Sequence, residues 1–289
     1  MSSLQVVRTV TDLREALAPT RRRDRVIGLV PTMGYLHAGH VSLIEAARER
    51  ADVVVMSLFV NPAQFGEGED LGSYPRDEER DLAMAAEAGV HVVFAPPAEE
   101  VYPAGFSTHV EVEGLTDVLC GDPSRRGASH FRGVTTVVAK LLNMADPDLV
   151  FFGQKDAQQA IVIRRMARDL DFRAEVVVMP TVRERDGLAL SSRNAYLDAS
   201  ERVRATALIR ALETARSSAA SGVDGALDAA RSVLADAEIE PEYLEARYVD
   251  DLELAQSFNG RPVLVAVAAR VGRARLIDNV VVGDAGGTT

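Results

Sequence analysis

The sequence is poor in cysteine and in positive charge, and no stretch of it stays apolar for long. Cys120 is the only cysteine, which excludes an intrachain disulfide and a zinc site made of cysteines. We expect its thiol to be buried and unreactive, because free cysteines usually are. No apolar run approaches the ~18 residues that a membrane-spanning helix needs, and residues 1–11 lack the charged-then-apolar pattern of a signal peptide. These features predict a cytoplasmic protein with no membrane partner.

Acidic residues outnumber basic ones, with 43 Asp and Glu against 32 Lys and Arg and a formal net charge of −11. A nucleic-acid partner requires a basic surface, so we expect none. A small anionic ligand is still compatible with this charge, because a local basic cluster can oppose the overall sign. The remaining composition, 47% hydrophobic and 26% charged over 289 residues, is ordinary for one large or two modest globular domains.

Strand-like apolar segments alternate with helix-like segments as far as about residue 180. This alternation predicts an α/β fold, a Rossmann-like parallel sheet flanked by helices and joined by right-handed crossovers. The predicted strands cover the start of residues 4–17 and residues 26–30, 52–60, 90–95, 149–152 and 174–179, with one more outside the sheet at 107–112. The predicted helices cover the rest of residues 4–17, capped by Thr11, and residues 39–50, 76–88, 131–144 and 156–170.

The pattern changes beyond residue 180. Two alanine-rich helical segments come first, and three apolar segments follow with no helix between the last two. This order predicts a smaller α+β C-terminal domain with an antiparallel sheet. The helices are predicted at residues 199–218 and 223–237, and the strands at residues 243–249, 263–271 and 275–282. We place the domains at residues 1–181 and 182–289.

The segment from Val26 to His40 carries the strongest indication of function. An apolar strand, which we expect Pro31 to end because proline has no N–H for a sheet, leads through a glycine-containing turn into a helix. His37 and His40 stand at this turn. A helix N-terminus suits phosphate, and two imidazoles would add donors for charge that develops on phosphate oxygens. A metal half-site and an ordinary surface pair are the alternatives, but His-x-Gly-His between strand and helix resembles the nucleotidylyltransferase signature.

Further polar residues follow other predicted strands, at the sheet edge where parallel sheets bind ligands. Gln64 can donate and accept hydrogen bonds and would suit a hydroxylated substrate, or it is a solvated loop amide. Lys155, after a strand and a glycine, is placed to contact a nucleotide phosphate. Asp156 either caps the next helix or binds a ribose hydroxyl. Ser191–Asn194 offers two hydroxyls and a guanidinium for phosphate, although such sequences also occur in plain turns.

Charged residues near this edge suggest additional contacts. Arg132, beside a predicted helix start, would bind a carboxylate or phosphate or act only as a cap. Asp70, Asp77 and Asp81 are candidates for Mg²⁺, which typically takes one or two carboxylates and otherwise binds water and substrate phosphates. A solvated helix face is the alternative for Asp77 and the two glutamates that follow it.

Six motifs taken in order closely resemble the pantothenate synthetase (pantoate–β-alanine ligase) family. They extend from Pro31 to Asn194, and the later Leu-Ile-Asp-Asn at residues 276–279 is also similar. The motifs are Pro-Thr-Met-Gly-x-Leu-His-x-Gly-His, Phe-Val-Asn-Pro-x-Gln-Phe, Tyr-Pro-Arg, His-Phe-Arg-Gly-Val, Phe-Phe-Gly-x-Lys-Asp-x-Gln-Gln and Ser-Ser-Arg-Asn. The combination is highly specific, although each motif alone is weak.

The resemblance implies an enzyme that joins pantoate to β-alanine in two steps. Pantoate would first attack the α-phosphate of ATP to give pantoyl adenylate and pyrophosphate, and the β-alanine amine would then displace AMP. The resemblance also implies Mg²⁺ as cofactor, a homodimer, and a smaller C-terminal domain that covers the nucleotide site.

The family's functional residues carry over to matching positions of this sequence. The implied catalytic residues are His37, His40 and Lys155, and the implied metal ligand is Asp81. The implied ATP-binding residues are Met33, Gly34, His40, Gly153, Lys155, Asp156, Val182, Ser191, Ser192 and Arg193. The implied pantoate-binding residues are Pro31, Met33, Gln64, His130 and Gln159.

Three positions depart from the family pattern. Gln154 stands where Glu is usual, Ala157 replaces an aromatic residue, and Leu190 replaces Met. The loss of a negative charge beside Lys155 predicts altered affinity for ATP or Mg²⁺ with an intact mechanism. Two other functions compete with the ligase: a nucleotidylyltransferase that needs no amine acceptor, and a non-catalytic nucleotide sensor, which would lack the phosphate-contacting residues that this chain keeps.

Overall fold

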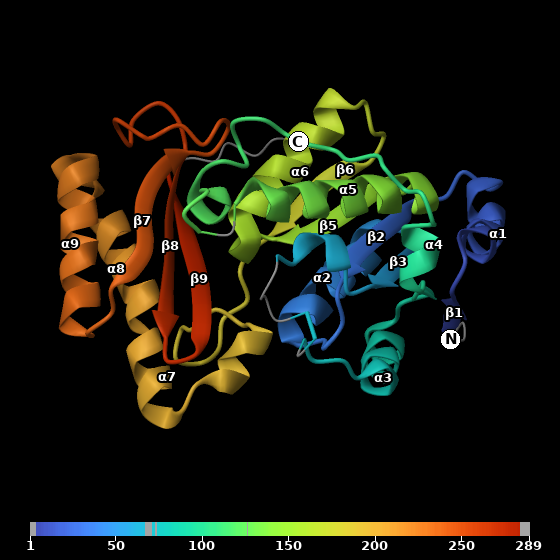
Figure 1. Ribbon diagram of the computed structural model, residues 1–289, viewed down its shortest axis with the longest axis horizontal. Coiled ribbons are helices and arrows are strands. Elements are labelled where there is room, and N and C mark those ends of the chain that lie inside the picture. Colours follow the sequence, from blue (N-terminus) through green and yellow to red (C-terminus); the bar gives the residue numbers. More distant parts are fainter. Residues whose placement is uncertain (1–3, 67–70, 73, 126, 284–289) are drawn as a thin grey trace. The chain divides into compact units, whose positions relative to one another are not determined.

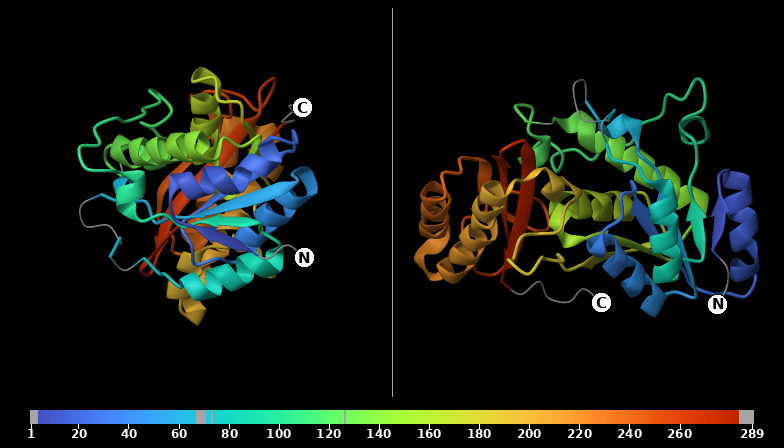
Figure 2. Two further views of the ribbon diagram at one scale, coloured as in Figure 1. Left: turned by 90° about the vertical axis from the view of Figure 1, so that its right-hand side faces the viewer. Right: turned by 90° about the horizontal axis from the view of Figure 1, so that it is seen from below.

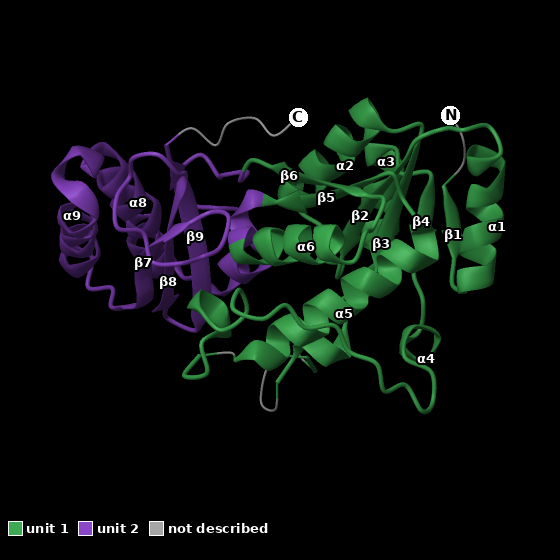
Figure 3. Cartoon of the chain, turned by 90° about the horizontal axis from the view of Figure 1, so that it is seen from above, with its two compact units in different colours: residues 1–153, 158–180 green, residues 154–157, 181–289 purple. Residues whose placement is uncertain are grey.

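The computed structural model describes residues 4–66, 71–72, 74–125 and 127–283 (Figure 1). Within them no helix is long and apolar enough to cross a membrane. The chain forms two compact units, unit 1 from residues 1–153 and 158–180 and unit 2 from residues 154–157 and 181–289 (Figure 3). The segment that carries Lys155 thus belongs to the C-terminal unit, while the chain on both sides of it belongs to unit 1. Asp70 lies outside the described residues.

Unit 1 is built on a six-stranded parallel sheet, which confirms the predicted α/β class. Its strands are β1 (Gln5–Val7), β2 (Ile27–Thr32), β3 (Val53–Leu58), β4 (Val92–Phe94), β5 (Leu149–Gly153) and β6 (Glu175–Met179). The spatial order is β1-β4-β3-β2-β5-β6, and every neighbouring pair is parallel. The order reverses between β2 and β5, and in such sheets ligands bind beyond the carboxyl ends at that reversal.

Helices cover both faces of this sheet, which is why its central strands are mostly apolar. Helices α2 and α3 lie on one face, and α5 and α6 lie on the other (Figures 1 and 2). Val30, Met56 and Phe151 of β2, β3 and β5 are fully buried in the core. The helices of unit 1 are α1 (Val10–Arg21), α2 (Ala38–Arg50), α3 (Glu78–Ala88), α4 (Ala98–Val101), α5 (Ala128–Ala145) and α6 (Ala157–Asp169).

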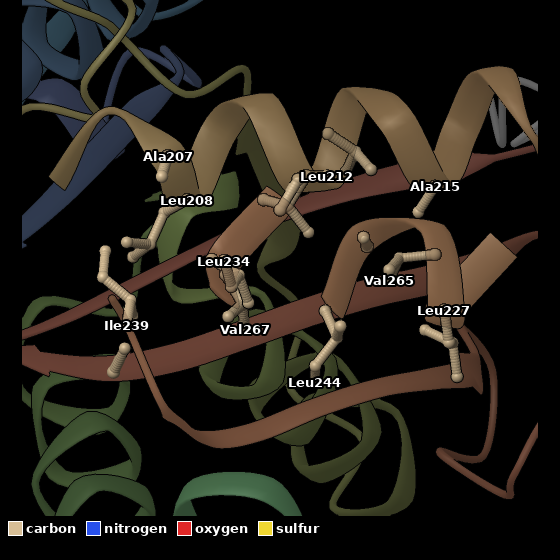
Figure 4. Close-up of a cluster of buried hydrophobic side chains, with 14 of the residues drawn as sticks. Ala207, Leu208, Leu212, Ala215, Leu227, Leu234, Ile239, Leu244, Val265 and Val267 are labelled. Atoms are coloured by element: carbon tan, nitrogen blue, oxygen red, sulfur yellow. The ribbon is translucent and has the colours of Figure 1, made fainter. Parts of the chain in front are cut away.

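Unit 2 has the predicted antiparallel sheet, three strands in the order β7-β8-β9. The strands are β7 (Pro241–Tyr248), β8 (Val263–Val271) and β9 (Ala274–Val282), and the helices are α7 (Ala199–Ala205), α8 (Ala207–Ser217) and α9 (Gly222–Asp236). Leu212 of α8 and Leu234 of α9 meet Val265 and Val267 of β8 in one apolar core (Figure 4). The even-numbered apolar residues of β9 belong to this core, so its odd-numbered residues project to the other face.

Two predictions about strands are wrong. β2 continues through Pro31 to Thr32 and pairs with β3 over its whole length, whereas its pairing with β5 involves only Gly28 and Leu29. Proline is tolerated at a position where the strand is paired on one side only. Residues 107–112 form no strand, because Val110 bonds to α5 hydroxyls instead, donating to Thr136 Oγ1 at 3.0 Å and accepting from Thr135 Oγ1 at 2.6 Å.

Two predictions about helices also differ from the structure. The N-cap of α1 is Thr9 rather than Thr11, and its side chain accepts from the Asp12 N–H. The single helix predicted over residues 199–218 is divided at Thr206 into α7 and α8. The Thr206 hydroxyl donates to the Val203 carbonyl at 2.7 Å, and such local side-chain bonds compete with regular helix geometry.

We expect His91, the residue before β4, to make the stability of unit 1 depend on pH. His91 Nδ1 accepts the Val54 N–H at 3.0 Å. Burial lowers the pKa of His91 below its ordinary value, and the nearby Arg48 lowers it further. Between the unfolded value of about 6.5 and the lower folded value, the unfolded chain binds more protons, so stability falls as the pH falls below about 6.5.

We expect His91→Asn, whose side-chain oxygen can still accept the Val54 N–H, to weaken this dependence. Urea unfolding at pH about 7.5, 6.5 and 5.5 measures it. The wild-type free energy of unfolding should drop more steeply than that of the variant, while His109→Asn, at an exposed histidine, should follow the wild type. Parallel curves for wild type and His91→Asn would contradict the assignment.

Candidate active site

The two histidines after β2 cap helix α2. His37 is the N-cap residue, and its Nδ1 accepts the Gly39 N–H at 3.2 Å. His40, three residues on, returns the interaction, since its Nδ1 accepts the His37 N–H at 3.3 Å. The ring centroids lie 4.2 Å apart. This reciprocal arrangement satisfies N–H groups that the first helical turn leaves without an intrahelical acceptor.

This capping determines which nitrogen of each ring carries the proton. A nitrogen that accepts a hydrogen bond needs its lone pair, so neither Nδ1 carries hydrogen. In the neutral imidazole the hydrogen is then on Nε2. Both rings therefore present Nε2–H donors at the N-terminus of α2, an end that already favours negative charge.

Asp81 of α3 fixes the loop that leads into this turn. Its carboxylate accepts the Tyr35 N–H and the Leu36 N–H, both at 2.7 Å, and only 1% of its side chain is exposed. Gly34 has φ +87°, and a Cβ there would lie 2.8 Å from Asp81 Oδ2. Arg80 Nη2 donates to the Leu36 carbonyl at 3.0 Å. The first turns of α3 thus hold the loop before His37 by its backbone.

Three of the residues predicted to bind pantoate lie together in unit 1. Gln64 Nε2 is 2.8 Å from Met33 Sδ, and the Gln64 carbonyl is 2.7 Å from His130 Nδ1. Gln64 follows β3, Met33 follows β2, and His130 lies in the first turn of α5. The juxtaposition is that expected for parallel strands, whose carboxyl ends meet at one edge.

Asn61 organises this group; it follows β3 as Gln64 does, but the sequence analysis assigns it no role. It is 1% exposed, and its amide donates to Gln64 Oε1 at 3.2 Å and to the Gly133 carbonyl at 3.1 Å. Its Oδ1 accepts the Tyr102 hydroxyl at 2.7 Å. Burial raises the pKa of Tyr102 to about 12, so this hydroxyl stays a donor. A buried amide with several polar partners rigidifies its surroundings.

The adjacent glutamines of α6 differ in their surroundings. Gln158 is buried: its Oε1 accepts the Cys120 N–H at 3.0 Å, and its Nε2 donates to the Leu115 and Val118 carbonyls. Cys120 is buried as expected. Gln159, the predicted pantoate residue, is half-buried. Gln158 therefore anchors the chain before α5, and its neighbour is the one available to a ligand.

Unit 2 carries Lys155 and the predicted ATP residues that follow it in the sequence. Lys155 lies in a short 3₁₀ turn, η3 (Gln154–Asp156), directly after Gly153 ends β5. Its side chain is 20% exposed, and Nζ lies 4.0 Å from Asp156 Oδ2. Val182 and Leu190 face each other across a hairpin, with the Leu190 N–H donating to the Val182 carbonyl at 3.0 Å.

The Ser-Ser-Arg-Asn segment follows this hairpin as a second 3₁₀ turn, η4 (Ser192–Tyr196). The Ser191 hydroxyl caps it by accepting the Arg193 N–H at 3.2 Å. Asn194 Nδ2 donates to Glu184 Oε1 at 3.0 Å. The Arg202 guanidinium, as hydrogen-bond donor, holds the pKa of Glu184 below its usual value. This carboxylate remains ionised, and the turn is tied to the hairpin.

The model for the pantoate–β-alanine ligase family matches residues 5–281 of the chain. A pantothenate synthetase from Moorella thermoacetica is 53% identical over 282 residues, 96% of this chain and 98% of that protein. The crystal structure of pantothenate synthetase from Thermus thermophilus has a TM-score of 0.88 at 48% identity and covers 96% of this chain and 98% of that chain. The chain belongs to the pantoate–β-alanine ligase family.

The ligase condenses pantoate with β-alanine at the expense of ATP. Another similar structure is that of the ligase from Francisella tularensis, solved with β-γ ATP and β-alanine, with a TM-score of 0.77, 31% identity and coverage of 96% of this chain and 97% of that chain. These matches confirm the family and activity expected from the motifs, and the expected use of ATP.

Gly133 provides a test of the Gln64 group. A Cβ at Gly133 would lie 2.1 Å from the Ala63 carbonyl oxygen and 2.6 Å from the Gln64 nitrogen, so Gly133→Ala must displace the turn that carries Gln64. We expect the pantoate KM to rise at least about tenfold, because misplacement by about 1 Å can cost on the order of a hundredfold.

Steady-state kinetics with varied pantoate measures this change, and thermal unfolding verifies that the fold persists. Gly72→Ala is the matched control, because a Cβ there meets none of the described residues within 4 Å. A folded Gly133→Ala enzyme with wild-type pantoate KM would show that this turn does not position the substrate.

Proposed function

We propose that this ligase works in two steps through a pantoyl adenylate. A pantoate carboxylate oxygen attacks the α-phosphorus of ATP, the bond to the β-bridging oxygen breaks, and pyrophosphate leaves. The neutral β-alanine amine then attacks the acyl carbon, the bond to the AMP oxygen breaks, and the nitrogen loses a proton. The products are pantothenate, AMP and pyrophosphate.

The observation that carries the first step is the pair of capped histidines. Two Nε2–H donors and a helix N-terminus together suit an α-phosphate on which negative charge increases. Because the Nδ1 atoms are used by the cap, the rings are oriented before substrate arrives. Such preorganised donors need no reorganisation during the reaction and are usually the largest single contribution to catalysis. We assign His37 and His40 this role.

The substrates are assigned to the residues that the resemblance implies for each of them. Pantoate is assigned to the Gln64, Met33 and His130 group with Gln159 and Pro31, where amides can bind its hydroxyls and carboxylate. The ATP phosphates are assigned to Lys155 and to Ser191, Ser192 and Arg193, which offer ammonium, hydroxyl and guanidinium donors. The nucleoside is assigned to Gly153 and Asp156, with Asp156 on the ribose.

Mg²⁺ is proposed to accompany ATP, bound mainly to its phosphates, as this ion commonly is. No group of three or more His, Cys, Asp or Glu among the described residues is arranged to hold a metal ion. Asp81, the ligand expected from the resemblance, is buried, and both of its oxygens accept backbone N–H groups. It does not fit a metal ligand, and we assign it the ordering of the loop instead. A homodimer remains part of the proposal on the strength of the resemblance, and a cytoplasmic location remains part of it on the strength of the sequence features given above.

Exchange of labelled pyrophosphate into ATP tests the two-step course. A reversible first step that precedes amine attack must exchange label when pantoate is present and β-alanine is absent. We expect exchange under these conditions and none with β-alanine alone. Exchange that requires β-alanine would mean that the amine enters before pyrophosphate leaves, and the adenylate would be excluded as a separate intermediate.

A variant of His40 separates its role in the helix cap from its proposed role as a hydrogen-bond donor to the phosphate. His40→Gln retains a side chain that can reach the N-cap N–H, as in other capping boxes, but removes the imidazole. It should lower pantoate-dependent exchange on the order of 10²–10³-fold with little change in thermal unfolding. Glu45→Gln, exposed on the same helix, is the matched control. Near-wild-type exchange in His40→Gln would remove the assigned role.

A further inference from the structure

The Lys155 turn is held by a side chain from the far end of the sequence. Asn279 of β9 is 5% exposed. Its Nδ2 donates to the Gln154 carbonyl at 2.9 Å and to the Lys155 carbonyl at 3.0 Å. Its Oδ1 accepts Gln154 Nε2 at 2.9 Å. Both ends of one buried amide thus bind η3, whose residues belong to unit 2 (Figure 3).

The orientation of this amide is determined by its partners. Two carbonyl oxygens can accept only from the NH₂ end of Asn279, so Oδ1 must face the Gln154 side chain. Gln154 can donate to it, and a carboxylate at that position could not. Gln154, one of the departures from the family pattern, therefore complements Asn279 through its amide NH₂.

The strand that carries Asn279 is itself well fixed. β9 pairs with β8 at every position from Ala274 to Val282. Asp278, 3% exposed, receives two hydrogen bonds from Arg183 at 2.6 and 3.0 Å. Adjacent residues on a strand point to opposite faces, so Asp278 ties the 182–190 hairpin to one face of β9 while Asn279 ties η3 to the other. Because the side chains of Asp278 and Asn279 are both buried, removing a hydrogen-bond partner of either one would lower the stability.

We propose that Asn279 is a positioning residue for Lys155 and sets where its ammonium meets the ATP phosphates. The proposal rests on the assignment of Lys155 to ATP made above. Asn279 acts on the backbone at Gln154 and Lys155, and it fixes the starting point of the lysine side chain relative to β9. The phosphate-binding lysine is thereby part of the C-terminal unit, together with Ser191, Ser192 and Arg193.

Asn279→Asp is the sharpest variant, because it keeps the side-chain shape but replaces two donated hydrogen bonds with oxygen–oxygen repulsion. We expect kcat/KM for ATP to fall about tenfold to a hundredfold, the range for a catalytic group displaced by about 1 Å. The pantoate KM should stay within about twofold, because the pantoate residues belong to unit 1. Val281→Ala, on the same face of β9, is the matched control and should leave kcat/KM for ATP near the wild-type value.

A double-mutant cycle with Lys155→Ala decides whether Asn279 acts through the lysine. In the Lys155→Ala background, Asn279→Asp should change kcat/KM for ATP by less than about twofold. An equal loss in both backgrounds, or no loss in the native background, would overturn the proposal. If Lys155→Ala alone has no effect, the assignment of Lys155 fails first, and the two failures are distinct.

A second variant keeps the test decisive if Asn279→Asp does not fold. Gln154→Ala removes only the bond from Gln154 Nε2 to Asn279 Oδ1. It should raise the ATP KM by a smaller factor, and this effect should vanish in the Lys155→Ala background. An effect that persists there, or a wild-type ATP KM, would overturn the proposal.

Discussion

The start of helix α2 imposes the constraint on which the rest of the site depends. Its first N–H groups need acceptors, and the chain supplies them as the Nδ1 atoms of His37 and His40. One set of hydrogen bonds therefore begins a helix and also fixes the orientation and tautomer of two rings. The loop before them is pinned by Asp81, whose buried carboxylate binds two successive N–H groups. The hydrogen bonds that stabilise this turn are therefore the same ones that orient the two imidazole rings.

Buried polar side chains perform the equivalent task elsewhere in the site. Asn61 holds the Gln64 turn in unit 1, and Asn279 holds the Lys155 turn in unit 2. Each is nearly inaccessible to solvent, and each binds a short 3₁₀ turn that presents a predicted substrate contact. Ligand-binding side chains on loops need such support to stay in a productive geometry. The predicted substrate contacts thus form separate sets, imidazole and amide groups in unit 1 and cationic and hydroxyl groups in unit 2.

Local pattern was enough to predict most of the fold. The apolar runs of β2 and β3 and the helical spacing behind His40 are short-range signals, and the structure confirms them. The prediction of a strand at residues 107–112 is wrong because the backbone of Val110 bonds to hydroxyls of α5, 25 and 26 residues further along the chain. The prediction of one helix over residues 199–218 is wrong because the Thr206 hydroxyl donates to a backbone carbonyl where the helix divides.

The residues of the candidate site also differ in whether local sequence could predict them. Residues next to strand ends, such as Gln64 and Lys155, could be selected because strand, turn and side chain are contiguous. The roles of Asn61 and Asn279 could not be predicted, since they depend on partners from distant parts of the chain: Asn61 bonds to the Gly133 carbonyl, and Asn279 lies 125 residues from Gln154. Asp81 was expected to be a metal ligand, and only the structure reveals that its oxygens accept backbone N–H groups.

Nitrogen NMR of the histidine side chains tests the central claim most directly. Protein labelled with ¹⁵N only in histidine contains five such rings, and signals lost in His40→Gln and His37→Asn identify the two that matter. At pH about 8, above the ordinary histidine pKa, the signals should show hydrogen on Nε2 of each ring and none on Nδ1. Hydrogen on Nδ1 of either ring would mean that the cap does not exist as described, and the account of preorganised phosphate donors would be wrong.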